Sequence, residues 1–490
     1  MQDDETSAAV TSTSATGWLA ELGVVAAAAA IRDGEVTAES YSAALLRRAR
    51  DYADLNSFIS IDESAVLAAA READRARADG FAAPLLGVPL GIKDSYTTRG
   101  LRTTLGVGIL DSFVPAEDAT IVTAVRKAGA IVFGKNNLVE MSYGLTGNNI
   151  HYGQVKNPHS FDRVSGGSSS GSAAAVAAQI VPAALGNDSL GSIRMPASLC
   201  GVVGFKPTTG RWSCDGVAPI SHTLDAPGVL ARSVEDCALI DEIVTRATVA
   251  PFSQASLKGT KFAYAPRQCL ELIEPDIEKL FEDTCERLRE AGAEIIEVDL
   301  GGDFSLIAEQ STWNIFFRET LETIPAFLQR HKFPVSFEEI YNQLDPEIKS
   351  VWNEIVLPSG PGRISADVYE TAITVGRPEI QRRFQEAFAR NGIQAFLFPT
   401  TPCTAPLIHE QAKFRIADNE VSDLALVKNT VATSGAGMPG VSIPVGLSGR
   451  RLPIGIEIDG APNHDRSLLD LARRVEQALG SLGSPAQNNR

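Results

Sequence analysis

The sequence predicts an α/β fold in which helices cover both faces of a mixed, largely parallel central sheet. Three observations support this class. Residues 1–80 have helical periodicity, short apolar runs alternate with helical segments from about residue 85, and strand-like runs return after residue 394. Strands that alternate with helices are typical of sheets packed between helical layers.

The N-terminal part is expected to form helices over residues 18–32, 37–52 and 62–79. Thr37 and Asp62 stand immediately before two of these helices and are expected to cap them. The apolar stretch 18–31 is interrupted by Glu21 and is too short to cross a bilayer, so it is interpreted as a core helix. We therefore expect residues 1–80 to form a helical segment packed on the rest of the protein.

The remainder of the chain divides into three parts. Residues 81–302 alternate strands and helices, residues 303–393 are mostly helical, and residues 394–490 return to strands before an amphipathic helix over 466–479. The apolar runs predicted as strands lie at 88–92, 130–133, 201–204, 262–264, 395–398, 441–445 and 454–458. The tail after Gly480 is rich in Gly, Ser, Pro and Asn, which predicts disorder. All parts are expected to form one compact unit.

Six aromatic side chains concentrate in the first part of the helical segment 303–393. They are Trp313, Phe316, Phe317, Phe327, Phe333 and Phe337. Aromatic side chains at this density usually form a core. A helical insertion beside a sheet can also cover a binding site as a lid, and the sequence leaves both interpretations open.

The composition excludes several classes of function. The chain has 490 residues and a formal net charge of −16, whereas nucleic-acid binding requires clustered Lys and Arg. Six cysteines without a Cys-x-x-Cys pair and six histidines without metal-ligand spacing indicate neither a disulfide framework nor a metal site. The acidic start lacks the positive charge of a secretory signal. We expect a cytoplasmic protein without cofactor, membrane or nucleic-acid partner, as a monomer or a homodimer.

A segment rich in Gly and Ser, residues 163–172, is the strongest candidate for chemistry, and three interpretations compete. A phosphate cradle at a helix N-terminus would need the Gly-Lys-Ser/Thr ending of a P-loop and a preceding strand, and neither is expected here. A nucleophile elbow would make Ser169 the nucleophile, but an elbow follows a buried strand and residues 157–164 are polar. A flexible loop without chemistry is the default for such a run in isolation.

The surroundings of this segment decide between the three. Downstream lie Ser192-Ile-Arg-Met-Pro-Ala and Cys200-Gly-Val-Val-Gly-Phe-Lys-Pro-Thr, and upstream lies Gly87-Val-Pro-Leu-Gly-Ile-Lys-Asp. In this order and spacing the motifs closely resemble the amidase-signature family of serine hydrolases. The resemblance extends from about residue 38 to residue 479. It implies the fold of that family, with residues 81–302 as the catalytic core.

The resemblance implies a catalytic triad in which Ser192 is the nucleophile, Ser168, in a cis peptide bond, is the relay, and Lys93 is the base. A serine hydroxyl is a weak nucleophile and needs a base within hydrogen-bond reach. A lysine can serve only when its pKa is lowered, and burial does this because it disfavours the ammonium form. Lys93 follows the apolar run 88–92, where burial is expected, although an isolated lysine at a strand end would more often face water.

The family pattern also implies an oxyanion hole made by four consecutive backbone N–H groups, those of Ser189, Leu190, Gly191 and Ser192. Asp188 and Arg194 are expected to form a buried ion pair that braces this turn, and Ser169 is expected to support the adjoining loop. The chain departs from the family pattern at Ser170 and Leu190, where glycine is usual. We expect Leu190 to narrow the substrate pocket.

Residues outside the signature motifs are expected to choose the substrate. Residues 141–149 and 211–220 resemble the subgroup that hydrolyses arylacetamides such as indoleacetamide and mandelamide. The candidate pocket residues are Tyr143, Gly144, Leu145, Thr146 and Leu190.

The resemblance implies hydrolysis of a small aryl or apolar amide through an acyl-enzyme. Urethanase-type relatives share this chemistry, so carbamates, anilides and esters are alternative substrates. A hypothesis of another class is the A subunit of a tRNA-dependent amidotransferase complex. A catalytically silent binding protein is disfavoured because all three catalytic positions are intact.

Overall fold

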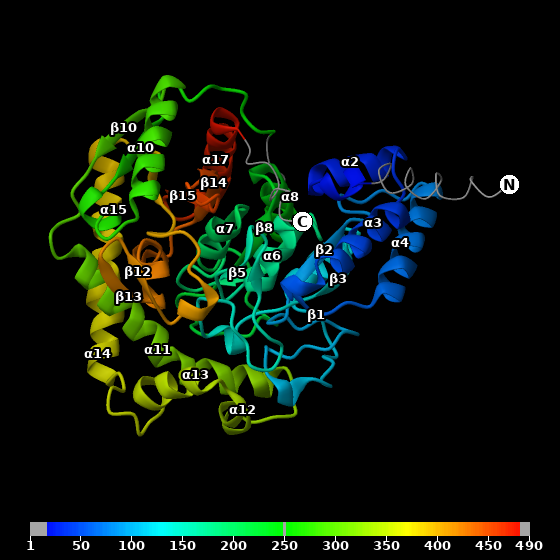
Figure 1. Ribbon diagram of the computed structural model, residues 1–490, viewed down its shortest axis with the longest axis horizontal. Helices are drawn as coiled ribbons and strands as arrows, with labels where there is room; N and C mark the ends of the chain where they lie inside the picture. The colour runs from blue at the N-terminus through cyan, green and yellow to red at the C-terminus, as the bar shows by residue number, and fades with distance from the viewer. Residues whose placement is uncertain (1–16, 248–250, 481–490) are drawn as a thin grey trace.

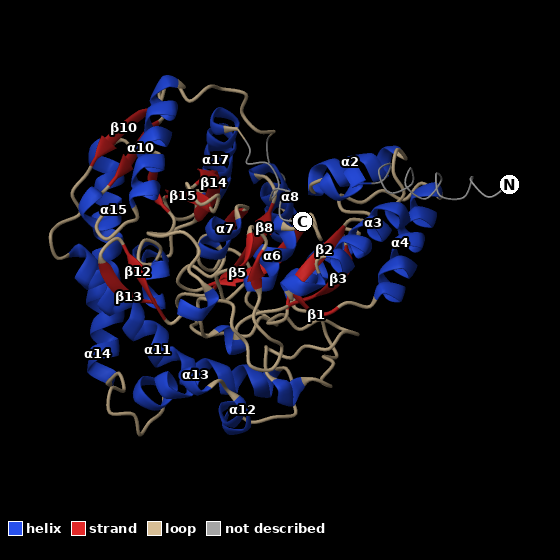
Figure 2. Ribbon diagram, in the orientation of Figure 1, coloured by secondary structure: helices blue, strands red, loops and turns tan. Residues whose placement is uncertain are grey.

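An 11-stranded mixed sheet forms the centre of the computed structural model, which describes residues 17–247 and 251–480. The strand order is β1-β3-β2-β6-β8-β7-β14-β15-β11-β9-β10 (Figure 1). Parallel pairs lie toward both ends, in β3-β2-β6 and β11-β9-β10, and antiparallel pairs connect the strands from β6 to β11. Helices lie on both sides of this sheet (Figure 2). The predicted α/β class, a mixed sheet covered by helices, is confirmed.

The strands of this sheet overlap all seven apolar runs that the sequence marks as strands, although the run 201–204 is a strand only from Val203 onward. They are β1 (Phe58–Ser60), β2 (Pro89–Lys93), β3 (Ile131–Asn136), β6 (Ala183–Asp188), β7 (Val203–Lys206), β8 (Ala226–Ala231), β9 (Lys261–Tyr264), β10 (Glu294–Glu297), β11 (Ala395–Pro399), β14 (Gly440–Leu447) and β15 (Pro453–Gly460). The central strands β2, β6 and β8 are buried along their whole length. Burial on both faces explains why these strands appear as apolar runs rather than as alternating patterns.

The N-terminal helices begin where the sequence predicts two caps. The helices are α2 (Val24–Asp33), α3 (Ala38–Asp51) and α4 (Glu63–Ala78). Thr37 Oγ1 accepts a hydrogen bond from Ser40 N at 3.0 Å, and Asp62 Oδ1 accepts one from Ala65 N at 3.0 Å. These side-chain oxygens occupy backbone N–H groups that have no partner within the helix, so both predicted N-caps are confirmed.

The single helix expected over residues 18–32 is wrong, because the chain forms a 3-10 turn, η1 (Gly17–Glu21), and then α2. Gly23 between them is extended, with φ −72° and ψ −178°. A Cβ on Gly23 would lie 2.5 Å from Asp236 Oδ2, and Asp236 Oδ1 accepts a hydrogen bond from Val25 N at 2.8 Å. Asp236, from helix α8 (Val234–Thr245), therefore caps α2 although it is distant in the sequence, and periodicity in residues 18–32 could not indicate this cap.

Outside the helical segment 303–393, the remaining helices are interspersed with the strands along the chain. They are α5 (Thr120–Lys127), α6 (Ser170–Ala177), α7 (Arg194–Cys200), α8 (Val234–Thr245), α9 (Pro266–Cys269), α10 (Pro275–Glu290), α16 (Val431–Ala436) and α17 (Asp465–Leu479). The final helix α17 buries Leu469, Ala472 and Val475 in the cluster that covers the sheet, as its amphipathic pattern predicts. The tail predicted to be disordered after Gly480 lies outside the described residues. Among the helices of the described ranges, none combines the length and the apolar character that a membrane crossing requires.

A strand does precede the Gly/Ser-rich segment, which corrects the expectation that none would. β5 (Ser160–Val164) pairs with β4 (Lys156–Asn157) in a separate two-stranded sheet, and a second small sheet pairs β12 (Lys413–Ile416) with β13 (Asn419–Ser422). Phe161 in β5 is 40% exposed. A surface hairpin needs no apolar face, so its polar sequence did not reveal it. β5 is not the buried strand that a nucleophile elbow requires.

The segment 303–393 is mostly helical, as predicted, and lies at one end of the sheet (Figure 1). Its helices are α11 (Phe304–Arg330), α12 (Phe337–Gln343), α13 (Pro346–Val351), α14 (Ala366–Thr371) and α15 (Arg377–Asn391), with π-helical turns η5 (Trp352–Val356) and η6 (Ala372–Gly376). Phe316, Phe327 and Phe333 are buried in one cluster, against which Trp313 and Phe337 pack. These aromatic side chains therefore belong to a core that the insertion shares with residues 105–110, 141–143, 190 and 218–224.

Candidate active site

Lys93 is the last residue of β2, and its side chain is fully buried. β2 pairs with β3 on one edge and with β6 on the other, so its end lies inside the sheet. Burial lowers the pKa of Lys93 from 10.5 to about 7, although the negative charges of Asp225 and Asp188 oppose the shift. A large fraction of this lysine is therefore neutral near pH 7 and able to accept a proton.

Ser168 lies directly against this lysine. Lys93 Nζ donates a hydrogen bond to Ser168 Oγ at 2.8 Å. The peptide bond between Gly167 and Ser168 is cis, and the loop continues into α6. A Cβ on Gly171 would lie 2.3 Å from the carbonyl oxygen of Ser57, so glycine is needed where the start of α6 meets the strand region of β1.

Ser192 stands between β6 and α7, alongside the Ser168 loop. Ser169 N donates a hydrogen bond to the carbonyl oxygen of Ser192 at 3.3 Å. Ser192 keeps 8% of its surface exposed, compared with 1% for Ser168 and 0% for Ser169. Ser169 Oγ lies 3.3 Å from both the backbone N and the backbone O of Asn187, so this side chain ties the loop to β6. The contacts fit Ser192 as the accessible serine and Ser169 as a support.

The turn that carries Ser192 is held at two points. Gly191 has φ 142°, and a Cβ there would lie 2.4 Å from Thr430 Oγ1, so only glycine fits this turn. Thr430 Oγ1 donates a hydrogen bond to the carbonyl oxygen of Leu190 at 2.5 Å. The carbonyl oxygen of Gly191 accepts one from Met195 N at 2.8 Å, which joins the turn to α7. These two hydrogen bonds hold the backbone of the turn in one conformation. They therefore also fix the orientation of the backbone N–H groups that are expected to form an oxyanion hole.

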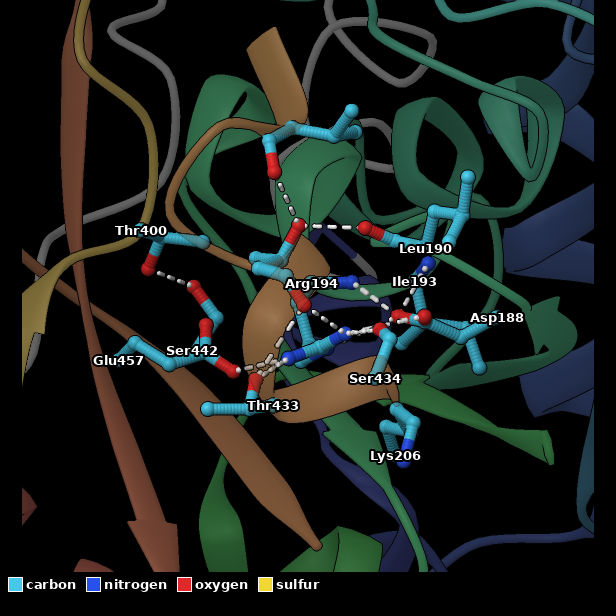
Figure 3. A network of polar contacts seen from close by, with 12 residues as sticks. Asp188, Leu190, Ile193, Arg194, Lys206, Thr400, Thr433, Ser434, Ser442 and Glu457 are labelled. Atoms are coloured by element: carbon cyan, nitrogen blue, oxygen red, sulfur yellow. Dashed lines mark hydrogen bonds and ion pairs between the residues drawn. The ribbon is translucent and has the colours of Figure 1, made fainter. Parts of the chain in front are cut away.

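Arg194 sits at the centre of a buried polar network behind this turn (Figure 3). The guanidinium contacts Asp188 at 3.0 and 3.1 Å on one side. On the other side it contacts Glu457 Oε1 at 3.1 Å, Thr433 Oγ1 at 3.0 Å and Ser434 Oγ at 2.6 Å. Burial alone would raise the pKa of Asp188, but the charge of Arg194 and its hydrogen bonds hold it below the usual value.

Asp188 also reaches the backbone of the turn. Its Oδ2 accepts hydrogen bonds from Ile193 N at 3.1 Å and from Arg194 N at 3.3 Å. The expected ion pair between Asp188 and Arg194 is therefore present. Because Asp188 precedes Ser192 and Arg194 follows it, the pair joins the two ends of the turn that carries Ser192. The other partners of Arg194 lie in α16 and β15 and are Thr433, Ser434 and Glu457. No local motif in the sequence indicated these contacts.

Two of the candidate pocket residues, Tyr143 and Leu190, belong to one apolar cluster with the helical insertion. The Tyr143 hydroxyl shares a hydrogen bond of 2.8 Å with Thr320 Oγ1 of α11. The Tyr143 ring centroid lies 5.1 Å from that of Phe316. Leu190, in the turn before Ser192, is buried in the same cluster. The insertion therefore lies against the turn that carries Ser192.

The remaining candidates do not join that cluster. Leu145 packs with Met195 in a different apolar cluster. The carbonyl oxygen of Thr146 accepts a hydrogen bond from Gln154 Nε2 at 2.9 Å, which is a contact within the loop. A Cβ on Gly167 would lie 3.1 Å from the carbonyl oxygen of Gly144, so the backbone at Gly144 passes beside the cis peptide.

Asp225 is a buried residue at the site that sequence reasoning missed. Ser189 Oγ donates a hydrogen bond to Asp225 Oδ1, and the charge of Asp225 acts on Lys93. Burial raises the pKa of Asp225 to about 6, although the hydrogen bond from Ser189 and two backbone N–H groups oppose this. The only signal in the sequence is one aspartate before an apolar run, which is too common to indicate a site.

A cavity and a metal centre are two other kinds of candidate functional site that the described residues could offer. A cavity of about 1120 Å³ lies between α15 and α17 and is lined by Arg377, Phe384, Phe388 and Arg466 among others. It contains neither Ser192 nor Lys93. Within residues 17–247 and 251–480, three or more His, Cys, Asp or Glu side chains nowhere gather as a metal site would need.

Comparison with known proteins points to one family. The family model "Amidase" matches residues 41–469. Mandelamide hydrolase of Pseudomonas putida is 36% identical over 483 residues, which cover 96% of this chain and 93% of that protein. Indoleacetamide hydrolase of Pseudomonas savastanoi is 34% identical, covering 92% and 95% of the two chains. The A subunit of glutamyl-tRNA(Gln) amidotransferase from Chromohalobacter salexigens is 36% identical, covering 92% and 95%.

Solved structures give the same result. A crystal structure of an amidase matches with a TM-score of 0.83 at 28% identity, covering 94% of this chain and all of the other. The native peptide amidase of Stenotrophomonas maltophilia matches with a TM-score of 0.79 at 27% identity, covering 97% of this chain and all of the other. The chain belongs to the amidase family and is an amide-hydrolysing enzyme.

Proposed function

We propose that this enzyme hydrolyses the C–N bond of a small aryl or apolar amide through an acyl-enzyme on Ser192. The observation that carries the proposal is the 2.8 Å hydrogen bond between Lys93 Nζ and Ser168 Oγ, buried beside Ser192. A lysine with a pKa lowered to about 7 by burial is suited to general base catalysis at neutral pH.

The proposed reaction has two halves. Ser192 Oγ attacks the amide carbonyl, its proton passes to Ser168 Oγ, and the Ser168 proton passes to the neutral amine of Lys93. The tetrahedral oxyanion accepts hydrogen bonds from backbone N–H groups of the turn 189–192. The relay then returns a proton to the leaving nitrogen, which departs as amine or ammonia. Water attacks the ester on Ser192 by the same route and releases the carboxylic acid.

The apolar environment of Leu190 and Tyr143 supports an aryl or apolar acyl group. Both side chains are buried among aromatic and aliphatic residues of the insertion. The relatives named mandelamide hydrolase and indoleacetamide hydrolase point to the same substrate class. Anilides and carbamates of aromatic amines fit the same chemistry, because their carbonyl carbon is attacked in the same way.

The test combines labelling with a substrate panel. A fluorophosphonate probe is expected to modify Ser192, as read by mass spectrometry of the peptide that contains it. Purified enzyme is then assayed on phenylacetamide, mandelamide, an acetanilide and a phenyl carbamate, with hexanamide as the non-aromatic comparison. Labelling at a serine other than Ser192, or failure to label the active protein, would contradict the proposal.

The similarity to a component of glutamyl-tRNA(Gln) amidotransferase supports a second candidate, a protein that works only within a complex. The two candidates differ in what the isolated chain can do. Hydrolysis of an arylacetamide by the purified chain at a rate of about 1 s⁻¹ or above, an ordinary enzymatic rate, favours the independent amidase. Hydrolysis only after the other components of such a complex are added would favour the second candidate.

A further inference from the structure

The turn that carries Ser192 has a second anchor on the side away from Arg194. Ser189 follows β6, and Asp225 precedes β8, the antiparallel neighbour of β6, with Asp188 opposite Ala226 in the register. The Ser189 hydroxyl donates a hydrogen bond to Asp225 Oδ1, and both residues are buried. The position of Asp225 is thus transmitted directly to the first residue of the proposed oxyanion hole.

Asp225 in turn fixes a short loop, residues 220–225. Its Oδ2 accepts hydrogen bonds from Ile220 N at 2.8 Å and from Ser221 N at 3.2 Å. Its own backbone N donates to the carbonyl oxygen of Ser221 at 3.1 Å. A carboxylate that accepts several N–H groups has a defined orientation, so the loop and the carboxylate hold each other.

Glu319 of α11 holds the same loop from the helical insertion. Its side chain is fully buried, and its Oε2 accepts hydrogen bonds from Ser221 Oγ at 2.5 Å and from Thr223 N at 3.0 Å. Its Oε1 accepts one from Thr223 Oγ1 at 2.6 Å. One turn further along α11, Thr323 Oγ1 donates to the carbonyl oxygen of Ile220 at 3.0 Å.

Glu319 has further partners that do not belong to the loop backbone. Tyr369 of α14 donates a hydrogen bond to Oε1 at 2.8 Å, and His222 Nε2 lies 3.2 Å from the same atom. A buried carboxylate is expensive unless it is hydrogen-bonded, and here most of its partners lie on a loop that leads to the nucleophile turn. If Glu319 served only to stabilise the insertion, hydrogen bonds to groups within the insertion would compensate for its burial equally well.

We infer that Glu319 is a positioning residue for catalysis, which acts through the loop 220–225 and Asp225 on Ser189 and the turn of Ser192. The helical insertion is thereby part of the catalytic apparatus and not only a cover. This inference rests on the proposed function, because it takes Ser192 as the nucleophile. A loosened turn misplaces the oxyanion donors, and displacements of about 1 Å cost roughly 100-fold in rate.

The experiment measures phosphonylation of Ser192 by a fluorophosphonate probe, as the rate constant at saturating probe. Each rate is normalised to the total protein that is labelled at the end, so that unfolded material is not counted. The variants are Glu319→Gln, Ser189→Ala and the double variant. Tyr369→Phe is the matched control, because it removes one hydrogen bond to Glu319 without touching the loop.

Glu319→Gln is expected to lower the rate constant by about 10- to 100-fold, while the probe concentration for half-maximal rate stays near that of the wild type. In the Ser189→Ala background the same substitution is expected to have an effect within about twofold, because coupled residues are not additive. Tyr369→Phe is expected to stay within about twofold of the wild type, because both oxygens of Glu319 keep their hydrogen bonds from Ser221 and Thr223 and the loop stays in place.

An unchanged rate in Glu319→Gln, or an equal loss in both backgrounds, would overturn the inference while leaving the proposed function intact. A wild-type enzyme that is not labelled at Ser192 would overturn the proposed function itself. If Glu319→Gln does not fold, Thr323→Val provides the test, since it leaves the Glu319 carboxylate in place and removes the hydrogen bond to Ile220, together with the contacts of the same hydroxyl to the carbonyl oxygens of Glu319 and Thr320 within α11. It is expected to slow labelling in the wild-type background but not in Ser189→Ala, and a rate equal to that of the wild type would overturn the inference.

Discussion

Lys93 Nζ and Ser168 Oγ lie 2.8 Å apart, and both side chains are withdrawn from solvent. A charged lysine in this position would lack the water that normally stabilises an ammonium ion. Burial therefore favours the neutral form of Lys93, and the next two predictions depend on that charge state.

Activity should rise with pH as Lys93 loses its proton. Because the pKa of Lys93 is lowered to about 7, kcat/KM on an arylacetamide is expected to increase about tenfold per pH unit below pH 7 and to level off above pH 8. The measurement is a pH-rate profile from pH 5 to pH 10 in buffers of constant ionic strength. A profile that stays flat down to pH 5 would mean that another group is the base.

Replacing Lys93 by methionine should abolish activity and stabilise the fold. In the unfolded chain Lys93 keeps its proton up to about pH 10.5, but in the folded protein only up to about pH 7. The lysine is therefore most destabilising below pH 7, and its effect fades as the pH rises toward 10.5. The gain in unfolding free energy from Lys93→Met should be about 3 kcal/mol larger at pH 6 than at pH 9, as measured by urea denaturation. An equal gain at both pH values would show that Lys93 is not desolvated.

Three serine variants separate the nucleophile from the relay and the support. Ser192→Ala should lose all turnover with the fold intact, and Ser168→Ala should lose several orders of magnitude because it removes the proton path. Ser169→Ala should keep more activity than either, since its side chain contacts only the backbone of Asn187. Initial rates on one substrate and circular dichroism spectra check this. Loss of activity in Ser169→Ala with a near-normal Ser168→Ala would restore the nucleophile elbow.

Gly191→Ala should be inactive and less stable. The residue has φ 142°, and the new Cβ would lie 2.4 Å from Thr430 Oγ1, so the turn must move. A residue forced into such backbone costs about 1–3 kcal/mol. Gly210→Ala is the matched control, because Gly210 also has a positive φ, of 86°, but a Cβ there meets open space. Thermal unfolding and kcat are compared, and equal losses in the two variants would show that the contact with Thr430 is unimportant.

Leu190→Gly should widen the range of accepted acyl groups. Leu190 is buried beside Tyr143 in the cluster under the insertion, so its removal leaves space in that cluster. We expect kcat/KM for bulky arylacetamides to rise relative to that for acetamide by about 10-fold, which corresponds to roughly 1.4 kcal/mol in a pocket contact. The ratio of the two kcat/KM values is the measurement. An unchanged ratio would place Leu190 outside the acyl pocket.

The sequence predicted the parts of this protein that depend on neighbouring residues. The strand ending at Lys93 and the caps at Thr37 and Asp62 follow from local rules, because each needs only a few adjacent residues. Family motifs singled out Ser168 and Ser192, and the structure brings Ser168 against Lys93 and the Ser168 loop against Ser192.

The sequence could not predict contacts that join distant segments. Glu319 lies 98 residues from Ser221, and Arg194 lies 263 residues from Glu457, so neither pair leaves a pattern within any window. The prediction of one helix over residues 18–32 failed for the same reason. The chain divides into η1 and α2, and the cap of α2 comes from Asp236, 211 residues beyond Val25. Burial of a polar side chain is decided by the partner it meets, and the partner is not visible locally.

The position of β14 between β7 and β15 has a consequence for how the enzyme is made. Lys93, Ser168 and Ser192 are translated more than 230 residues before Thr430, Thr433 and Glu457, which hold the turn and Arg194. A ribosome-bound chain that lacks these later residues has Ser192 and Arg194 without the contacts that hold them in the folded protein. The turn of Ser192 is therefore expected to become ordered only after β14 and β15 have been translated and have joined the sheet.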